Sequence, residues 1–243
     1  MYGNHRLNQH NILRYGLTID FCQSFRSLKY LGIELPYVLI RHFHSFIKPF
    51  VDKNLTNQPY IKKLQMKHKI YTIKDVREKL NFAPKMKRDL STYTHRKTIL
   101  MSGVFAPFAL DQFPHSNVIL INANHYDNSA IDKAFEARKL PGNISIFNFQ
   151  KFYNKVVIPK TLRARYIRQL QKLLSANRNH ELFGTLKFQN WIKKNLLRSL
   201  KWIHSLEFLI QKRPVGLIFD HFEITYPGNI LGLIAQKYNL PFI

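Results

Sequence analysis

The polar residues that directly follow two apolar runs are the ones in this sequence best suited to chemistry. Asp220 and His221 follow the run Val215–Phe219, and His125 lies just after a second run at residues 117–123. A carboxylate or an imidazole at the end of a buried strand, facing a cleft, can accept a proton from a hydroxyl group. We therefore predict Asp220, His221 and His125 as catalytic bases. In the alternative interpretation, Asp220 caps its loop and His221 points to solvent.

The residues around these bases are predicted to bind substrate. In an open parallel sheet, ligands gather at the carboxyl ends of the strands. Three clusters are placed there: Ser102-Gly103 with Phe105, Asn124 to Asp127, and Asp220-His221 with Glu223. The residues predicted to bind substrate are Gly103, Asn124, Tyr126, Asp127 and Glu223, together with Asn229 at the start of the following helix. A helix opened by Pro227 would present free N–H groups near Asn229 to a phosphate or a hydroxyl. Asp127 has an alternative role, which is to cap a helix that begins near Ser129.

Several classes of site are disfavoured. The sequence contains no GxGxxG, P-loop, GxSxG, HExxH or CxxC motif, so we predict no dinucleotide, no other cofactor and no bound metal. His42 and His44 lie about 200° apart on a helix, whereas a metal-binding pair needs i, i+4 spacing. Cys22 is the single cysteine, so no internal disulfide can form, and a reducing compartment is indicated.

The C-terminal stretch sets the arrangement that positions these residues. Val215–Phe219 is a short apolar run of the kind that forms a strand buried on both faces. Pro227 opens a helix with apolar residues on one side, and this helix ends near Asn239. Residues 240–243 start the next strand. The pattern predicts a parallel β-α-β unit that is cut off inside its second strand.

The preceding residues continue the same alternation. We predict strands at 98–105, 117–123 and 144–149, and helices at 129–139, 159–176 and 188–211. This order indicates an α/β fold, Rossmann-like, with a parallel sheet flanked by helices. We assign residues 96–243 to this domain, with a truncated C-terminal end.

Residues 1–95 are predicted to form a basic, helical N-terminal annex. Helices are indicated at 7–31 and 37–53, and the aromatic residues Phe43, Phe46 and Phe50 belong to a core or insert into lipid. The basic loop at 82–97 is either solvated or a contact for nucleic acid.

The charge of the chain is strongly unbalanced. It has 38 Lys and Arg against 14 Asp and Glu, a formal net charge of +24. Such a field attracts polyanions such as nucleic acid, anionic lipid headgroups or phosphorylated substrates. No signal peptide is visible, and charged residues interrupt the most apolar stretch at 30–51, so no spanning helix is predicted. We expect a cytoplasmic protein or one peripheral at the inner face of the cell membrane.

The C-terminal stretch also resembles a known family. The segments that carry the resemblance are Lys212-Arg213-Pro214, the strand closed by Asp220, the small and apolar helix 231–237, and Tyr238-Asn239-Leu240-Pro241. They are similar to the end of the N-terminal half of GT-B glycosyltransferases that make bacterial surface polysaccharides, and to the glycerophosphotransferases of teichoic-acid synthesis. Asn239 stands where that family prefers glycine.

The resemblance implies one half of a GT-B fold, inactive without its C-terminal half. That missing half would bind a nucleotide-activated sugar, and the half in hand would bind a lipid-linked or polysaccharide acceptor near an anionic membrane surface. Asp220, His221 or His125 would then be the base of an inverting transfer. The alternatives are a basic α/β module that binds nucleic acid and a noncatalytic assembly protein at a membrane surface.

Overall fold

In a computed structural model, the chain is described for residues 5–80, 98–136, 139–220 and 226–242, with backbone alone at 226–228. These residues belong to two compact units. The first comprises residues up to 83 together with 161–196, and the second comprises 84–160 and 197–243. Residues 161–196, predicted as part of the α/β domain, belong to the first unit, because Phe183, Phe188 and Trp191 join its aromatic core around Phe21. The predicted boundary near residue 95 lies outside the described residues.

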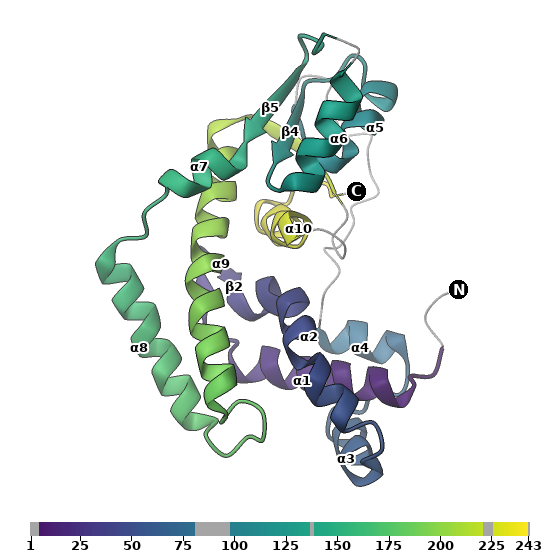
Figure 1. Ribbon diagram of the computed structural model, residues 1–243, viewed down its shortest axis with the longest axis vertical. Coiled ribbons are helices and arrows are strands. Elements are labelled where there is room, and N and C mark those ends of the chain that lie inside the picture. Colours follow the sequence, from purple (N-terminus) through teal and green to yellow (C-terminus); the bar gives the residue numbers. More distant parts are fainter. Residues whose placement is uncertain (1–4, 81–97, 137–138, 221–225, 243) are drawn as a thin grey trace. The chain divides into compact units, whose positions relative to one another are not determined.

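The second unit contains a parallel four-stranded sheet (Figure 1). Its strands are β3 (Thr98–Ser102), β4 (Val118–Asn122), β5 (Ile144–Asn148) and β6 (Val215–Phe219), in the order β5-β4-β3-β6. Each neighbouring pair is parallel. Phe242 adds a parallel bridge to Ile218 on β6. The predicted α/β, Rossmann-like fold and the parallel β-α-β unit at the C-terminus are therefore confirmed.

Helices cover β3, β4 and β6, which are buried along nearly their whole length. They are the short 3-10 turn η2 (Gly103–Phe105), α5 (Ala106–Gln112), α6 (His125–Phe135), α7 (Phe149–Lys155) and α10 (Tyr226–Tyr238), with the last part of α9 (Leu186–Lys212). In Figure 1, α5 and α6 lie side by side next to β4. The core joins strand and helix residues, among them Ile99, Met101, Leu120, Ile131 and Leu217. β5 is an edge strand, so Ile146 on it stays exposed.

The end of α10 shows why asparagine suits position 239. Asn239 has a φ of 53°, in the left-handed region that terminates many helices. The N–H of Leu240 then donates to the carbonyl of Ala235 at 2.9 Å. Glycine and asparagine are the two residues that tolerate this conformation best. Asparagine at this position therefore supports the same helix end that a glycine would form.

The first unit is helical. It contains α1 (Gln9–Ser24), α2 (Leu35–Lys53), α3 (Gln58–His68), α4 (Ile73–Leu80), α8 (Lys160–Ala176) and the start of α9, with the short antiparallel pair β1 (Lys29–Tyr30) and β2 (Ile33–Glu34). The predicted helical annex is thus present. Phe43 is fully buried and stacks on Phe21 at 4.4 Å between ring centroids, so it belongs to the core and not to a lipid-facing surface.

The buried carboxylate of Asp20 connects three parts of this unit. Asp20 of α1 is hydrogen-bonded or ion-paired to Lys67 and His68 of α3 and to His180, which follows α8. Burial opposes ionisation of Asp20, but the hydrogen bonds from His180, His68 and Lys67 outweigh it. They hold the pKa of this carboxyl well below its usual range.

Candidate functional site at the carboxyl edge of the sheet

The last residue of β3 and the first residue after β6 form a buried polar pair. The hydroxyl of Ser102 donates a hydrogen bond to Oδ2 of Asp220, and the two residues are 1% and 4% exposed. From β3 the chain runs through β4 to β5 on one side, and β6 lies on the other side of β3. Asp220 therefore stands where the strand order reverses, which is the usual position of ligands in open α/β sheets.

Asp127 ties the loop after β3 to the loop after β4. Its carboxylate accepts hydrogen bonds from the N–H of Val104 (3.1 Å), the N–H of Ala123 (2.9 Å) and the amide of Asn124 (2.9 Å). Burial raises the pKa of Asp127, and the hydrogen bonds from the backbone partly offset this effect. Three hydrogen bonds from the two loops occupy both of its oxygens, so Asp127 positions these loops.

Gly103 allows the same two loops to approach closely. A Cβ at this position would lie 2.8 Å from Cβ of Asp127 and 2.8 Å from Cδ1 of Ile131. These distances are shorter than real carbon–carbon contacts, so any side chain here would force the 3-10 turn away from α6. Gly103 thus shapes the sheet edge through its backbone.

Asn124 is the residue before α6, which begins earlier in the chain than the predicted helix 129–139. Its Oδ1 accepts hydrogen bonds from the N–H groups of Tyr126 (2.8 Å) and Asp127 (3.2 Å), which makes it the N-cap of α6. The predicted start near Ser129 is therefore wrong by about one turn. An Asn followed three residues later by an acidic residue is the signal that could have located it.

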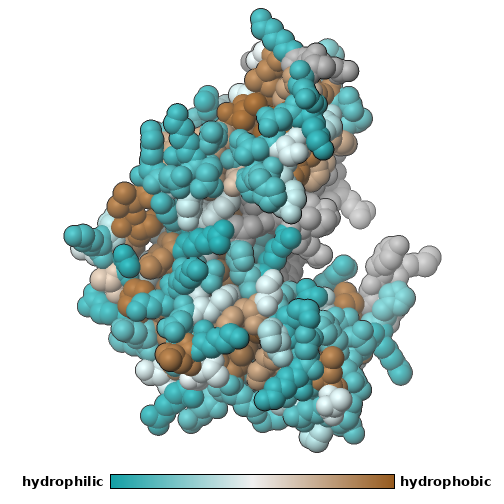
Figure 2. Space-filling model, viewed as in Figure 1, coloured by the Kyte–Doolittle hydropathy of each residue, from teal (hydrophilic) through white to brown (hydrophobic). Residues whose placement is uncertain are grey.

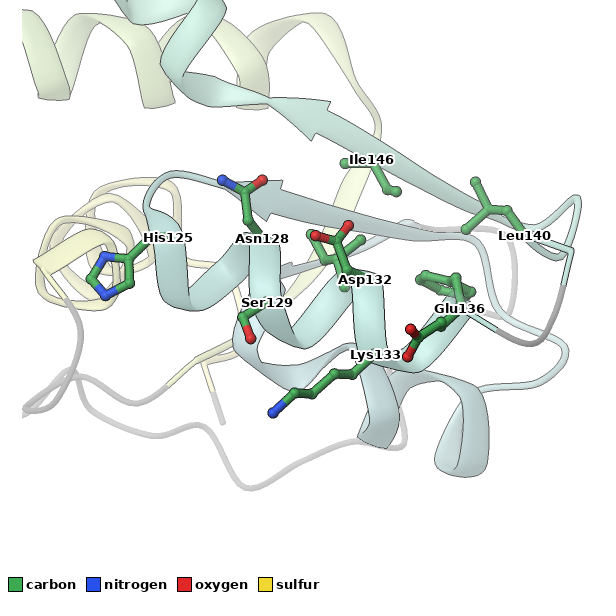
Figure 3. A pocket seen from close by; sticks show the side chains of 10 residues that line it. His125, Asn128, Ser129, Asp132, Lys133, Glu136, Leu140 and Ile146 are labelled. Carbon is green, nitrogen blue, oxygen red and sulfur yellow. The ribbon is translucent and has the colours of Figure 1, made fainter.

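His125 and Tyr126 lie in the first turn of α6 and are exposed. Their ring centroids are 3.8 Å apart, and Tyr126 is 68% exposed. Figure 3 shows His125 at the start of the helix, away from the body of α6. The two rings offer a small aromatic surface beside the carboxyl ends of the strands.

Three predicted site residues remain, and the structure describes one of them, Asn229. Asn229 is the fourth residue of α10 and is 7% exposed. His221 and Glu223 lie outside the described residues. The structure thus brings Gly103, Asn124 and Asp127 together through a hydrogen bond and close contacts after β3 and β4. It pairs Asp220, which follows β6, with Ser102 at the end of β3.

An open groove extends from His125 along α6 (Figure 3). Its volume is about 720 Å³. Asn128 and Asp132 of α6 face Ile146 of β5 across it, and Leu140 and Glu136 lie toward its far end. The sequence did not predict this groove, because it depends on β5 being an edge strand.

The segment that contains α5 and α6 is acidic, unlike the rest of the chain. Residues 103–136 contain four carboxylates (Asp111, Asp127, Asp132 and Glu136) and one basic residue, Lys133, in a protein with a formal net charge of +24. Phosphate sites in proteins rely on Arg, Lys or a free helix N-terminus, and here the N-terminus of α6 is occupied by Asn124. The edge is mixed in charge, because Asp127 lies after β4 while α7, which follows β5, carries the exposed Lys151 and Lys155. Its carboxylate and amide oxygens can accept hydrogen bonds from the hydroxyl groups of a ligand.

Comparison with protein families, curated proteins and solved structures gave no match for this chain. Within the described ranges, no three His, Cys, Asp or Glu side chains are grouped as a metal ion would require. The helices in those ranges also include none that is long and apolar enough to cross a membrane.

Proposed function

We propose that this chain provides the acceptor-binding, Rossmann-like domain of a glycosyltransferase of the GT-B type. The observation that carries the proposal is the Ser102–Asp220 pair at the point where the strand order reverses, on an edge built from carboxylate and amide side chains. The resemblance of the C-terminal stretch to GT-B enzymes agrees with this arrangement.

The chemistry of the edge suits a sugar or another polyol. Hydroxyl groups donate hydrogen bonds to carboxylates such as Asp220, and the exposed rings of His125 and Tyr126 offer faces for the C–H groups of a sugar ring.

In the proposed reaction, Asp220 is the base and Ser102 is a positioning residue. The carboxylate takes the proton from an acceptor hydroxyl, whose oxygen attacks the anomeric carbon of a nucleotide-activated sugar. The bond from that carbon to the nucleotide diphosphate breaks, and the diphosphate leaves with the electron pair. His125 is the alternative base, and His221 and Glu223 keep the roles predicted from the sequence.

Binding of neutral oligosaccharides tests the proposal without any donor. We expect glucose-, galactose- or N-acetylglucosamine-terminated oligosaccharides to shift backbone amide NMR signals of residues 102–104 and 123–128. Asp220→Asn should weaken this binding at least about tenfold, because an amide is a poorer acceptor than a carboxylate. Asp111→Asn, an exposed carboxylate on α5, is the matched control and should leave it unchanged.

Two results would contradict this assignment. One is the absence of shifts at the sheet edge with the whole panel of saccharides. The other is equal weakening by Asp220→Asn and Asp111→Asn, which would indicate a general charge effect.

A further inference from the structure

Helix α8 carries basic residues on one exposed face. Arg165, Arg168 and Lys172 follow one another at spacings of three and four residues, so they lie along one side of the helix. All three are exposed, and α8 contains no acidic residue. We call these three residues the α8 basic stripe.

The opposite side of α8 packs against other residues of the first unit. Tyr166 and Leu170 are buried, and the hydroxyl of Tyr166 donates to the carbonyl of Lys29. The amide of Gln169 donates to the carbonyl of Ser27 at 2.8 Å. Because these contacts fix the rotation of α8, the basic stripe is presented outward by the packing of the helix.

The stripe is not neutralised by neighbouring carboxylates. Residues 161–196 include eight Lys and Arg and one acid, Glu181. Among the residues that the structure describes, no carboxylate lies within ion-pair distance of Arg165, Arg168 or Lys172. Three adjacent, uncompensated cations raise the local positive potential and favour an anionic partner.

We propose that the α8 basic stripe binds the phosphodiester backbone of nucleic acid without sequence specificity. Guanidinium groups match the oxygens of a phosphate in two-point hydrogen bonds, and two of the three residues are arginines. The stripe spans about 10 Å along the helix axis, room for several successive phosphates of one strand. The stripe belongs to the first unit, whereas the residues of the saccharide site proposed for the sheet edge belong to the second unit.

A membrane surface fits this face less well. A helix that lies on a bilayer turns apolar side chains toward the lipid, but the large apolar residues of the chain that stay exposed include none from α8. Figure 2 shows hydrophilic residues over most of the visible face, with apolar residues in separate groups. An anionic vesicle therefore serves as the competing probe in the test.

The test measures fluorescence anisotropy of a labelled 20-base-pair DNA duplex of arbitrary sequence with the full chain at several NaCl concentrations. The variant R165Q/R168Q/K172Q should bind at least about tenfold more weakly near 0.1 M salt. The slope of log affinity against log salt should become less negative by about two to three, because each lost phosphate contact reduces the magnitude of this slope by about 0.9. Vesicles containing phosphatidylserine are titrated in parallel.

The matched control is K151Q/K155Q/R213Q, which removes three exposed positive charges from the second unit. In this control, the duplex affinity and the slope against log salt should each change by less than about half of the change seen in R165Q/R168Q/K172Q. Equal losses in the two variants would overturn the proposal in favour of diffuse attraction by the net charge. A variant that loses vesicle binding and keeps duplex binding would overturn it in favour of a membrane partner. Saccharide binding at the sheet edge should be the same in both variants.

Discussion

The imidazole of His44 is held in one protonation state by its neighbours. Arg14 can only donate, so its hydrogen bond of 2.7 Å makes Nδ1 of His44 an acceptor. Nε2 then carries the proton and donates to Thr18 Oγ at 2.9 Å, and Thr18 donates to the carbonyl of Arg14 at 2.7 Å. Burial, followed by the charge of Arg14, lowers the pKa of His44 to about 3.

This lowered pKa predicts a loss of stability in mild acid. In the unfolded chain, histidine gains its proton near pH 6.5, whereas folded His44 stays neutral. The unfolded state thus binds more protons as the pH falls below about 6.5, and the free energy of unfolding decreases by up to about 1.4 kcal/mol per pH unit. Urea unfolding between pH 7 and pH 5 should therefore show a decrease of about 2 kcal/mol due to His44.

His44→Gln separates this effect from the titration of other groups. Its free energy of unfolding should depend less on pH over the same range, whereas exposed His115→Gln should keep the dependence of the natural protein. An unchanged pH dependence in His44→Gln would show that the imidazole titrates normally in the folded state.

The position of Asp220 could be predicted from sequence, but its partner could not. A polar residue that closes a buried strand stands at the sheet edge, so Asp220 and Asn124 were located by the apolar runs before them. Ser102 lies 118 residues from Asp220, and their contact depends on β3 and β6 being neighbours. The burial of Asp127, likewise, follows from the contact between two loops.

At the scale of elements, the strands were predicted more accurately than the helix starts. Short, mainly apolar runs mark the buried strands β3, β4 and β6 clearly, because both faces are covered. The start of α6 was missed because its first turn, His125 to Asn128, is polar and reads as a loop. In the structure, the N-cap hydrogen bonds of Asn124 stabilise this turn as the start of the helix.

The close contact between η2 and α6 leads to a prediction for Gly103. Gly103→Ala should lower the free energy of unfolding by about 1–3 kcal/mol, because its Cβ would meet Cβ of Asp127 and the carbonyl of Ile121. Gly142→Ala is the control, since a Cβ there has no atom within 4 Å, and its effect should stay within about 0.5 kcal/mol. Urea unfolding of both variants measures the difference, and equal values would argue against a tight turn at Gly103.

At the scale of the whole molecule, charge is distributed unevenly along the chain. Residues 103–136, which include α5 and α6, contain four carboxylates and one Lys, while residues 161–196 contain eight Lys and Arg and one acid. The sequence shows this contrast directly. Which of these charges lie at the carboxyl ends of the strands depends on how the helices run back along the sheet, and that could not be predicted from composition.

The net charge of +24 predicts that simple salt stabilises the protein. Repulsion among the cations opposes the compact state, and ions screen it over about 30 Å at 0.01 M but about 10 Å at 0.1 M. The midpoint of thermal unfolding should therefore rise by a few degrees between 0.01 and 0.3 M NaCl, as expected for a gain near 1 kcal/mol. R165Q/R168Q/K172Q should show a smaller rise, because three mutually repelling charges have been removed. A midpoint that falls with NaCl would instead mean that attractive pairs such as Lys237 with Glu207 outweigh the repulsion.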